Sequence, residues 1–207
     1  SNGEFVNNGQ GSYFHEKIIR LSEEELEGIS EIINQTINDK DFISGNELYD
    51  AIKTKYSYII EENKAISVYG FRDALKAKIG DRFSFKGNII SHSGNELSMA
   101  DVFAKYSKAH DSFTLSELQG LASNLATVIY FDALSEVSVR VSHDLFVSKK
   151  RINFDVDSVD KVIESFMSKD YIRIREIDSF LAFPSVGYEW NEYMLESFLI
   201  SYSKKFV

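Results

Sequence analysis

The sequence predicts a mostly α-helical fold with short β-hairpins, an α+β protein built from similar small units. One pattern occurs three times, at residues 42–52, 113–123 and 171–181: an aromatic residue, a short β-prone stretch, and a helix that opens on an acidic residue followed by an apolar one. Internal repetition is the sequence signature of an array of units. With 43% hydrophobic and 14% aromatic residues, the 207-residue chain can bury one large core or two to three small ones.

The first helix is predicted to begin after Ser22. This serine suits an N-cap, and Glu25 stands three residues later, as a capping box requires. Apolar side chains then recur at helical spacing, which places them on one face toward a core. They are Leu26, Ile29, Ile32, Ile33 and Ile37.

The remaining elements of the first unit follow in order. Residues 42–43 predict a brief extended stretch, and Ser44 or Asn46 can cap the next helix. A third helix is expected over residues 67–77. Residues 82–91 alternate aromatic and polar side chains and then pass through a Lys-Gly-Asn turn to two isoleucines, which is typical of a β-hairpin.

The same order recurs in a second unit, and Lys149-Lys150-Arg151 is predicted to be the turn of its hairpin. The expected elements are a helix at 99–108, a strand at 113–115, a helix capped by Ser116, a third helix at 129–137, and hairpin strands at 143–148 and 152–154.

A third unit is predicted to be shorter. Its expected elements are a helix from residue 157, a strand at 171–174, a helix at 176–183 and a last helix at 190–206. Pro184 ends the short helix, because the residue before a proline is pushed out of the α region. No hairpin follows, so this unit is expected to be wingless or truncated.

Helix, short strand, helix, helix and hairpin is the element order of a winged helix. From about residue 21 onward, the chain therefore resembles winged-helix domains of the helix-turn-helix superfamily in tandem. The resemblance implies winged-helix-like units at residues 21–95 and 96–156, and a wingless or truncated helical unit at 157–207. Residues 1–20 are expected to be a flexible lead-in or tag remnant, since the chain opens Ser-Asn-Gly without methionine.

The sequence contains no residue set with the spacing of a catalytic, cofactor or metal site. It has no cysteine, and its four histidines stand singly, at positions 15, 92, 110 and 143. The eleven glycines are dispersed and form no phosphate-binding loop. The acidic run at residues 23–25 suits a helix N-terminus, where carboxylates complement the helix dipole. We therefore expect a non-enzymatic protein with no cofactor and no metal.

Basic residues concentrate in one segment of the otherwise acidic first unit. Residues 64–92 contain six lysines and arginines against two aspartates, whereas residues 20–63 contain four basic and eleven acidic residues. In a winged helix that reads DNA, the third helix enters the major groove and the hairpin lies along the phosphates. The resemblance thus implies nucleic-acid contacts by Lys64, Arg72, Lys76, Lys78, Arg82 and Lys86.

The second and third units suit nucleic acid less well. The basic turn formed by Lys149, Lys150 and Arg151 is expected to touch the phosphate backbone, but the helix before it is acidic and would repel phosphates. The third unit is slightly acidic around its last helix. Acidic winged helices are expected to serve as protein-docking modules.

Two functions therefore remain open. The leading expectation is that the chain binds nucleic acid through its first unit, in regulation of transcription or in DNA transactions. The alternative is a protein-interaction scaffold that uses the winged-helix units as docking modules. The formal net charge of −9 argues against a general nucleic-acid coat. No apolar run approaches the roughly 20 residues that span a bilayer, and no signal segment opens the chain. A cytoplasmic protein without a membrane partner is expected.

Overall fold

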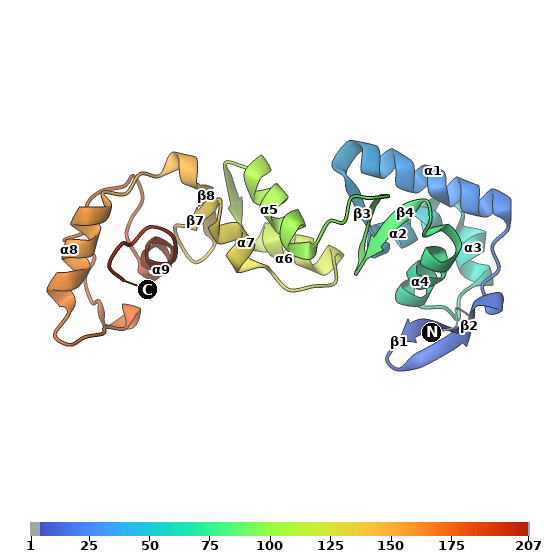
Figure 1. Cartoon of the computed structure of the whole chain (residues 1–207), viewed down its shortest axis with the longest axis horizontal. Coiled ribbons are helices and arrows are strands. Elements are labelled where there is room, and N and C mark those ends of the chain that lie inside the picture. The colour runs from blue at the N-terminus through green and yellow to red at the C-terminus, as the bar shows by residue number, and fades with distance from the viewer. Residues whose placement is uncertain (1–4, 207) are drawn as a thin grey trace. The chain divides into compact units, whose positions relative to one another are not determined.

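The computed structural model describes residues 5–206 (Figure 1). About 51% of the chain is helical and 15% is strand, arranged in small antiparallel sheets, which confirms the α+β fold class. The residues divide into two compact units. One comprises the chain up to Met99 together with residues 123–127, and the other comprises residues 100–122 and the chain from Val128 onward.

The first long helix, α1 (Glu23–Lys40), begins with the predicted capping box. The Ser22 hydroxyl accepts a hydrogen bond from the Glu25 N–H, and the Glu25 carboxylate accepts one from the Ser22 N–H. The helix ends at Asp41, whose φ of 69° turns the chain away. The predicted apolar face is confirmed, because all five of its side chains are buried: Leu26, Ile29, Ile32, Ile33 and Ile37.

A three-stranded sheet follows α1, in the order β3-β5-β4, with β5 antiparallel to both neighbours. The predicted hairpin is confirmed, and Gly87 and Asn88 form its turn. The short helix α3 is an addition to the predicted order. The elements are β3 (Phe42–Ser44), α2 (Gly45–Lys55), α3 (Ser57–Glu62), α4 (Val68–Ile79), β4 (Phe83–Lys86) and β5 (Ile89–His92).

The N-terminal segment forms a hairpin where a flexible lead-in was expected. β1 (Phe5–Gly9) pairs with β2 (Ser12–His15), and the 3-10 helix η1 (Glu16–Ile18) follows. Val6 is buried, and its cross-strand partner Phe14 packs against the core. The flexible lead-in was expected because the segment is rich in Gly and Asn, although its apolar and polar positions alternate as in a strand. The residues expected to be a tag remnant, Ser-Asn-Gly at the start, lie outside the described residues.

The second unit has a sheet in the order β6-β8-β7, the same arrangement as in the first unit. Thr114, rather than Ser116, caps the helix after the first strand, since its hydroxyl accepts from the Glu117 N–H at 3.2 Å. The elements are α5 (Met99–Ala109), β6 (Ser112–Thr114), α6 (Leu115–Asn124), α7 (Phe131–Ser135), β7 (Ser138–Arg140) and β8 (Leu145–Ser148).

The second hairpin lies earlier in the chain than predicted. Residues 141–144 join β7 to β8, so Lys149–Arg151 form the 3-10 helix η2 after the hairpin instead of its turn. Burial explains the difference, because Val139 and Val147 pair across the two strands and are both buried. The helix expected at 129–137 is shortened to α7.

The C-terminal segment adds α8 (Val156–Phe166), the 3-10 helix η3 (Ile174–Glu176) and α9 (Glu192–Ser201). The strand expected at 171–174 and the helix expected at 176–183 do not form. The apolar side chains of this segment do not make a core of their own, because they join the core under the second hairpin. That core includes Val139, Val147, Val159, Ile163, Met194 and Phe198. The contacts between residues therefore divide the chain into two compact units, whereas the sequence predicted three.

Candidate functional site

The two arginines predicted to contact nucleic acid from the first unit are held by carboxylates. The Arg72 side chain is 17% exposed, and its guanidinium donates to the Asp73 carboxylate and lies 5.8 Å from the centre of the Tyr69 ring. Arg82 bonds the carboxylate of Glu27 on α1. These pairs turn the two guanidinium groups toward the protein's own acids.

The four lysines of the predicted site are more accessible. Lys86, beside the turn of the first hairpin, lies 3.8 Å from the Glu96 carboxylate. Lys64, Lys76 and Lys78 are exposed and have no ion-pair partner within residues 5–206. Lys76 and Lys78 lie at the end of α4 and line one hollow, whereas Lys64 precedes this helix. The structure does not bring the six cations together into one cluster.

The N-terminal hairpin packs against the start of α4, a contact that the sequence pattern did not predict. The Ser67 N–H donates to Asn8 Oδ1 at 2.7 Å, and the Ser67 hydroxyl donates to the Asn8 carbonyl oxygen at 2.6 Å. Gly70 makes room for this contact, because a Cβ there would lie 2.3 Å from Asn8 Oδ1. The first turn of α4, which would lead into a DNA groove in a winged helix, is thus flanked by the hairpin.

The basic residues of η2 lie in three different settings. Lys149 is half-buried over the Tyr202 ring at 5.1 Å, and burial lowers the pKa of its amine. Arg151 lies 4.0 Å from the Asp111 carboxylate. Lys150 is exposed. Since η2 follows the hairpin, these residues do not form the basic hairpin tip that the sequence predicted.

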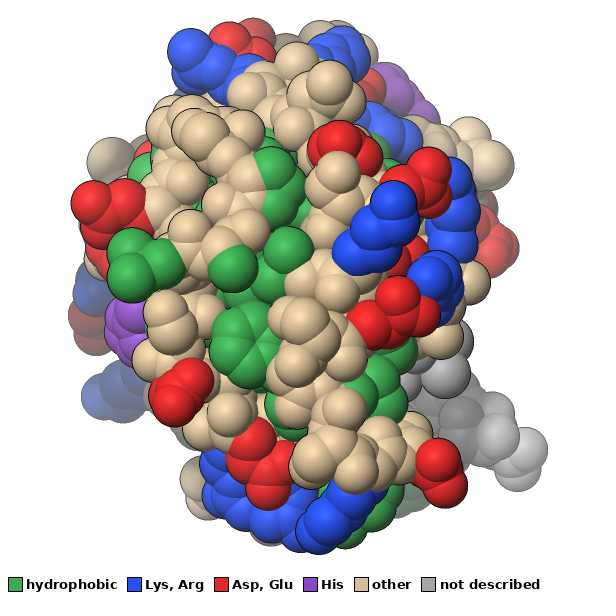
Figure 2. Space-filling view, turned by 90° about the vertical axis from the view of Figure 1, so that its left-hand side faces the viewer, with side chains coloured by type: hydrophobic (Ala, Val, Ile, Leu, Met, Phe, Trp, Pro, Cys, Tyr) green, Lys and Arg blue, Asp and Glu red, His purple; other side chains and the backbone are tan. Residues whose placement is uncertain are grey.

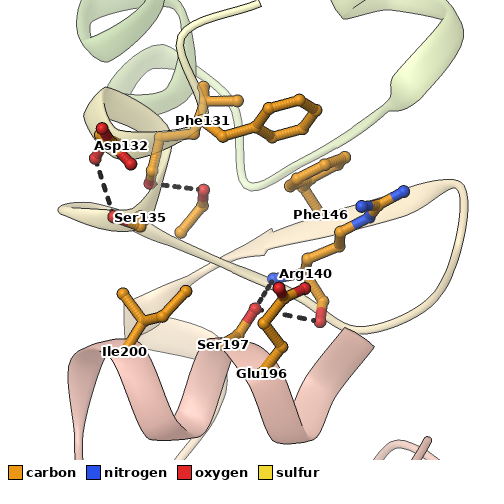
Figure 3. Close-up of a pocket in the computed structure, with 10 residues that line it drawn as sticks. Phe131, Asp132, Ser135, Arg140, Phe146, Glu196, Ser197 and Ile200 are labelled. Atoms are coloured by element: carbon orange, nitrogen blue, oxygen red, sulfur yellow. Dashed lines mark hydrogen bonds between the residues drawn. The ribbon is translucent and has the colours of Figure 1, made fainter. Parts of the chain in front are cut away.

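A hollow of about 320 Å³ lies within the second unit, between α7, β7 and α9 (Figure 3). It is lined by Phe131, Asp132, Leu134 and Ser135 of α7, Ser138 and Arg140 of β7, Phe146 of β8, and Glu196, Ser197 and Ile200 of α9. The hollow was not predicted, because its walls come from segments that are far apart in the sequence.

Hydrogen bonds from α9 fix one wall of the hollow to β7. The Ser197 hydroxyl accepts from the Arg140 N–H at 3.0 Å and donates to the Arg140 carbonyl oxygen at 3.4 Å. The Ser201 hydroxyl donates to the Ser135 carbonyl oxygen at 3.2 Å. The two Ser197 bonds satisfy the outward backbone groups of Arg140 on the edge strand β7, which would otherwise need water, and the Ser201 bond joins α9 to α7.

The Arg140 guanidinium is occupied by aromatic rings and by the backbone. Its central carbon lies 4.3 Å from the centre of the Tyr193 ring and 5.4 Å from that of Phe146. Its Nη2 donates to the His143 carbonyl oxygen at 2.6 Å, while its buried Nε has no partner within the described residues. A cation over aromatic faces is stabilised by the ring quadrupoles. These contacts hold the Arg140 guanidinium within the wall of the hollow, so we do not interpret it as an anion-binding group.

The rim of the hollow combines apolar and acidic side chains. Phe131 is 45% exposed and Ile200 is 66% exposed. Asp132 and Glu196 stand beside them, and neither has an ion-pair partner in residues 5–206. The end of this unit shown in Figure 2 also exposes hydrophobic side chains near the middle of its face. At this rim, apolar surface therefore lies next to carboxylates that have no ion-pair partner in the described part of the chain.

Comparison with protein-family models, with curated proteins and with solved structures finds no match for this chain. Across residues 5–206, no helix combines the length and the apolar character needed to cross a membrane. Within the same residues, no three acidic, histidine or cysteine side chains are grouped so that they could hold a metal ion.

Proposed function

We propose that this chain is a non-enzymatic tandem winged-helix protein whose main task is to dock another protein. The order of elements supports the winged-helix assignment for both units. In each, a helix, a strand, further helices and a hairpin follow one another, and the strand before the helices pairs with the last strand of the hairpin, β3 with β5 and β6 with β8. Residues 5–20 add a hairpin to the first unit, and α8 and α9 extend the second.

The hollow between α7, β7 and α9 is the observation that supports docking. Its volume of about 320 Å³ is large enough for one or two side chains of a partner. Phe131 and Ile200 offer apolar surface, and removing apolar surface from water favours association. The partner segment we propose carries an apolar side chain that enters the hollow and a Lys or Arg beside it, which pairs with Asp132 or Glu196.

A designed peptide tests this proposal. The full chain is titrated into a short labelled peptide in which one leucine is flanked by lysines, and fluorescence anisotropy reports binding. We expect saturable binding that is lost in the double variant Phe131→Ala, Glu196→Lys. Leu181→Ala is the matched control, since Leu181 is 97% exposed in the same unit and does not line the hollow. If the wild type, the double variant and Leu181→Ala bind the peptide equally, or if none of them binds it, the proposal that the hollow docks a partner is wrong.

Nucleic-acid binding by the first unit is the second candidate, favoured by the exposed lysines of α4 and by Lys86 beside the hairpin turn. A labelled DNA duplex at low salt provides the test. If the first unit binds DNA, the triple variant Arg72→Glu, Lys76→Glu, Lys86→Glu should no longer bind the duplex. The control variant Lys53→Glu on α2 should bind it as the wild type does. Each lost phosphate contact should also make log K less dependent on log salt by about 0.9.

A further inference from the structure

The outer strand of the first sheet is open at a position that is covered in the second unit. β4 is the outer strand in the order β3-β5-β4, as β7 is in β6-β8-β7. In the second unit, Ser197 of α9 bonds both the N–H and the carbonyl oxygen of Arg140 on this outer strand. No described residue bonds the corresponding groups of Phe85 in the first unit from outside the sheet.

The register of the two hairpins shows that Phe85 and Arg140 correspond. Lys86 pairs with Ile89 across the two-residue turn, and Phe85 pairs with Ile90 one step further back. In such a hairpin the pair next to the turn is hydrogen-bonded, so the preceding residue directs its backbone N–H and C=O away from the partner strand. Arg140 has the same outward orientation, because its N–H reaches Ser197.

A second hollow, of about 370 Å³, adjoins the β4 edge. Lys76, Ala77 and Lys78 at the end of α4 form one side of it, and Phe83 and Phe85 of β4 form the other. Gly80 and the acidic Asp81, between the helix and the strand, complete the lining. The hollow of the second unit occupies the same corner between third helix and outer strand, but there α9 supplies a further wall. Within the described residues, the first unit has no element in the place of α9.

We propose that the β4 edge and its hollow bind an amphipathic helix of a partner protein, placed on β4 as α9 is placed on β7. The helix presents a Ser or Thr hydroxyl to the backbone of Phe85. Its acidic residues face Lys76 and Lys78, which have no ion-pair partner in residues 5–206. The half-buried Phe85 ring supplies apolar contact. This surface is separate from the hollow of the second unit, so either proposal can fail without the other.

A peptide copied from the chain's own residues 189–203 is the probe. It contains α9 with Ser197 and three glutamates, and in the full chain the second unit already holds its own α9. We expect saturable binding to the full chain, with amide chemical-shift changes at residues 76–78 and 83–86. The double variant Lys76→Glu, Lys78→Glu should weaken binding at least about tenfold, which is 1.4 kcal/mol. Lys53→Glu on α2 should leave it unchanged.

Two further variants sharpen the test. Ala77→Trp fills the hollow from an exposed position and should weaken binding as strongly as the double variant. A peptide carrying Ser197→Val lacks the hydroxyl and should bind several-fold more weakly. The proposal is overturned if the peptide does not bind saturably, if its shift changes fall outside the β4 edge, or if neither protein variant weakens it.

Discussion

Thr114 and Glu117 bond each other reciprocally at the start of α6. The Glu117 carboxylate accepts from the Thr114 N–H at 2.7 Å, and the Thr114 hydroxyl accepts from the Glu117 N–H at 3.2 Å. Ser44 and Glu47 form the same pair at α2, with both bonds at 3.0 Å. The acidic residue that recurs in the sequence pattern is therefore the third residue of a capped helix.

The third copy of the pattern keeps only half of this arrangement. The Glu176 carboxylate accepts from the Arg173 N–H at 3.0 Å, but the Arg173 side chain has no acceptor for a helix N–H. Only the short η3 forms there. The missing cap accounts for a short η3 in place of a longer helix, and no strand or sheet forms in this third copy of the pattern.

Removing a cap should destabilise the second unit measurably. We expect Thr114→Ala to lower the free energy of unfolding by about 1 kcal/mol, because it leaves a helix N–H without an acceptor. Urea denaturation measures the change. Ser116→Ala is the matched control, since Ser116 makes no capping bond, and its effect should be near zero. A larger effect at Ser116 than at Thr114 would show that the cap is misassigned.

The Glu117 carboxylate should make stability depend on pH. Hydrogen bonds from the Thr114 hydroxyl and N–H lower its pKa below the ordinary value of 4.5. A lowered folded-state pKa contributes stability that is complete above the ordinary pKa and is lost as the pH falls toward the lowered value. Thermal unfolding on both sides of this range should show a smaller acid loss for Glu117→Gln than for the wild type. If the wild type and Glu117→Gln lose stability identically as the pH falls, the Glu117 carboxylate is not a source of the pH dependence.

Phe198→Ala should unfold the second hairpin and the C-terminal helices together. Phe198 is fully buried, and its ring centre lies 5.3 Å from that of Phe154. Truncating a buried phenylalanine costs about 3–5 kcal/mol. Because β7, β8, α8 and α9 share one core, amide hydrogen exchange should rise in all four elements.

Leu48→Ala is the counterpart of this variant in the first unit, where Leu48 is equally well buried. It should leave hydrogen exchange of β7, β8, α8 and α9 unchanged. If Phe198→Ala speeds exchange in α8 and α9 alone, the C-terminal segment is a separate body, as the sequence pattern predicted.

The hydroxyl of Ser197 should contribute to the fit of α9 on β7. Ser197→Ala leaves the Arg140 N–H and carbonyl oxygen without their partner. An unsatisfied group in this position costs about 1–3 kcal/mol, whereas Ser197→Thr keeps the hydroxyl and should cost less. Chemical denaturation compares the two variants, and equal losses from Ala and Thr would mean that the bond contributes little.

The sequence predicted elements best where periodicity and capping agree. In α1, the capping box and the apolar spacing both mark the same helix, and the first hairpin has a glycine turn between alternating residues. The second hairpin was misplaced because a cluster of three basic residues resembles a turn, whereas the burial of Val139 and Val147 decides the register. The N-terminal hairpin was not predicted, because its Gly- and Asn-rich composition is typical of a flexible segment.

The candidate sites were harder to predict, since they depend on tertiary contacts. Counting charges located a basic segment, but nothing in the count shows that Arg82 meets Glu27 across 55 positions of the chain. The hollow of the second unit brings Phe131 and Ile200 together from distant helices. Local patterns carry no information about such pairs.

Separate binding measurements with the two proposed partners decide whether this chain docks a protein segment or DNA. Binding of the full chain to the lysine-flanked leucine peptide and to a labelled DNA duplex is measured side by side at physiological salt. We expect the peptide to bind, the double variant Phe131→Ala, Glu196→Lys to lose this binding, and the duplex not to bind. Duplex binding that disappears on Arg72→Glu, Lys76→Glu, Lys86→Glu, with no binding of the peptide, would contradict it.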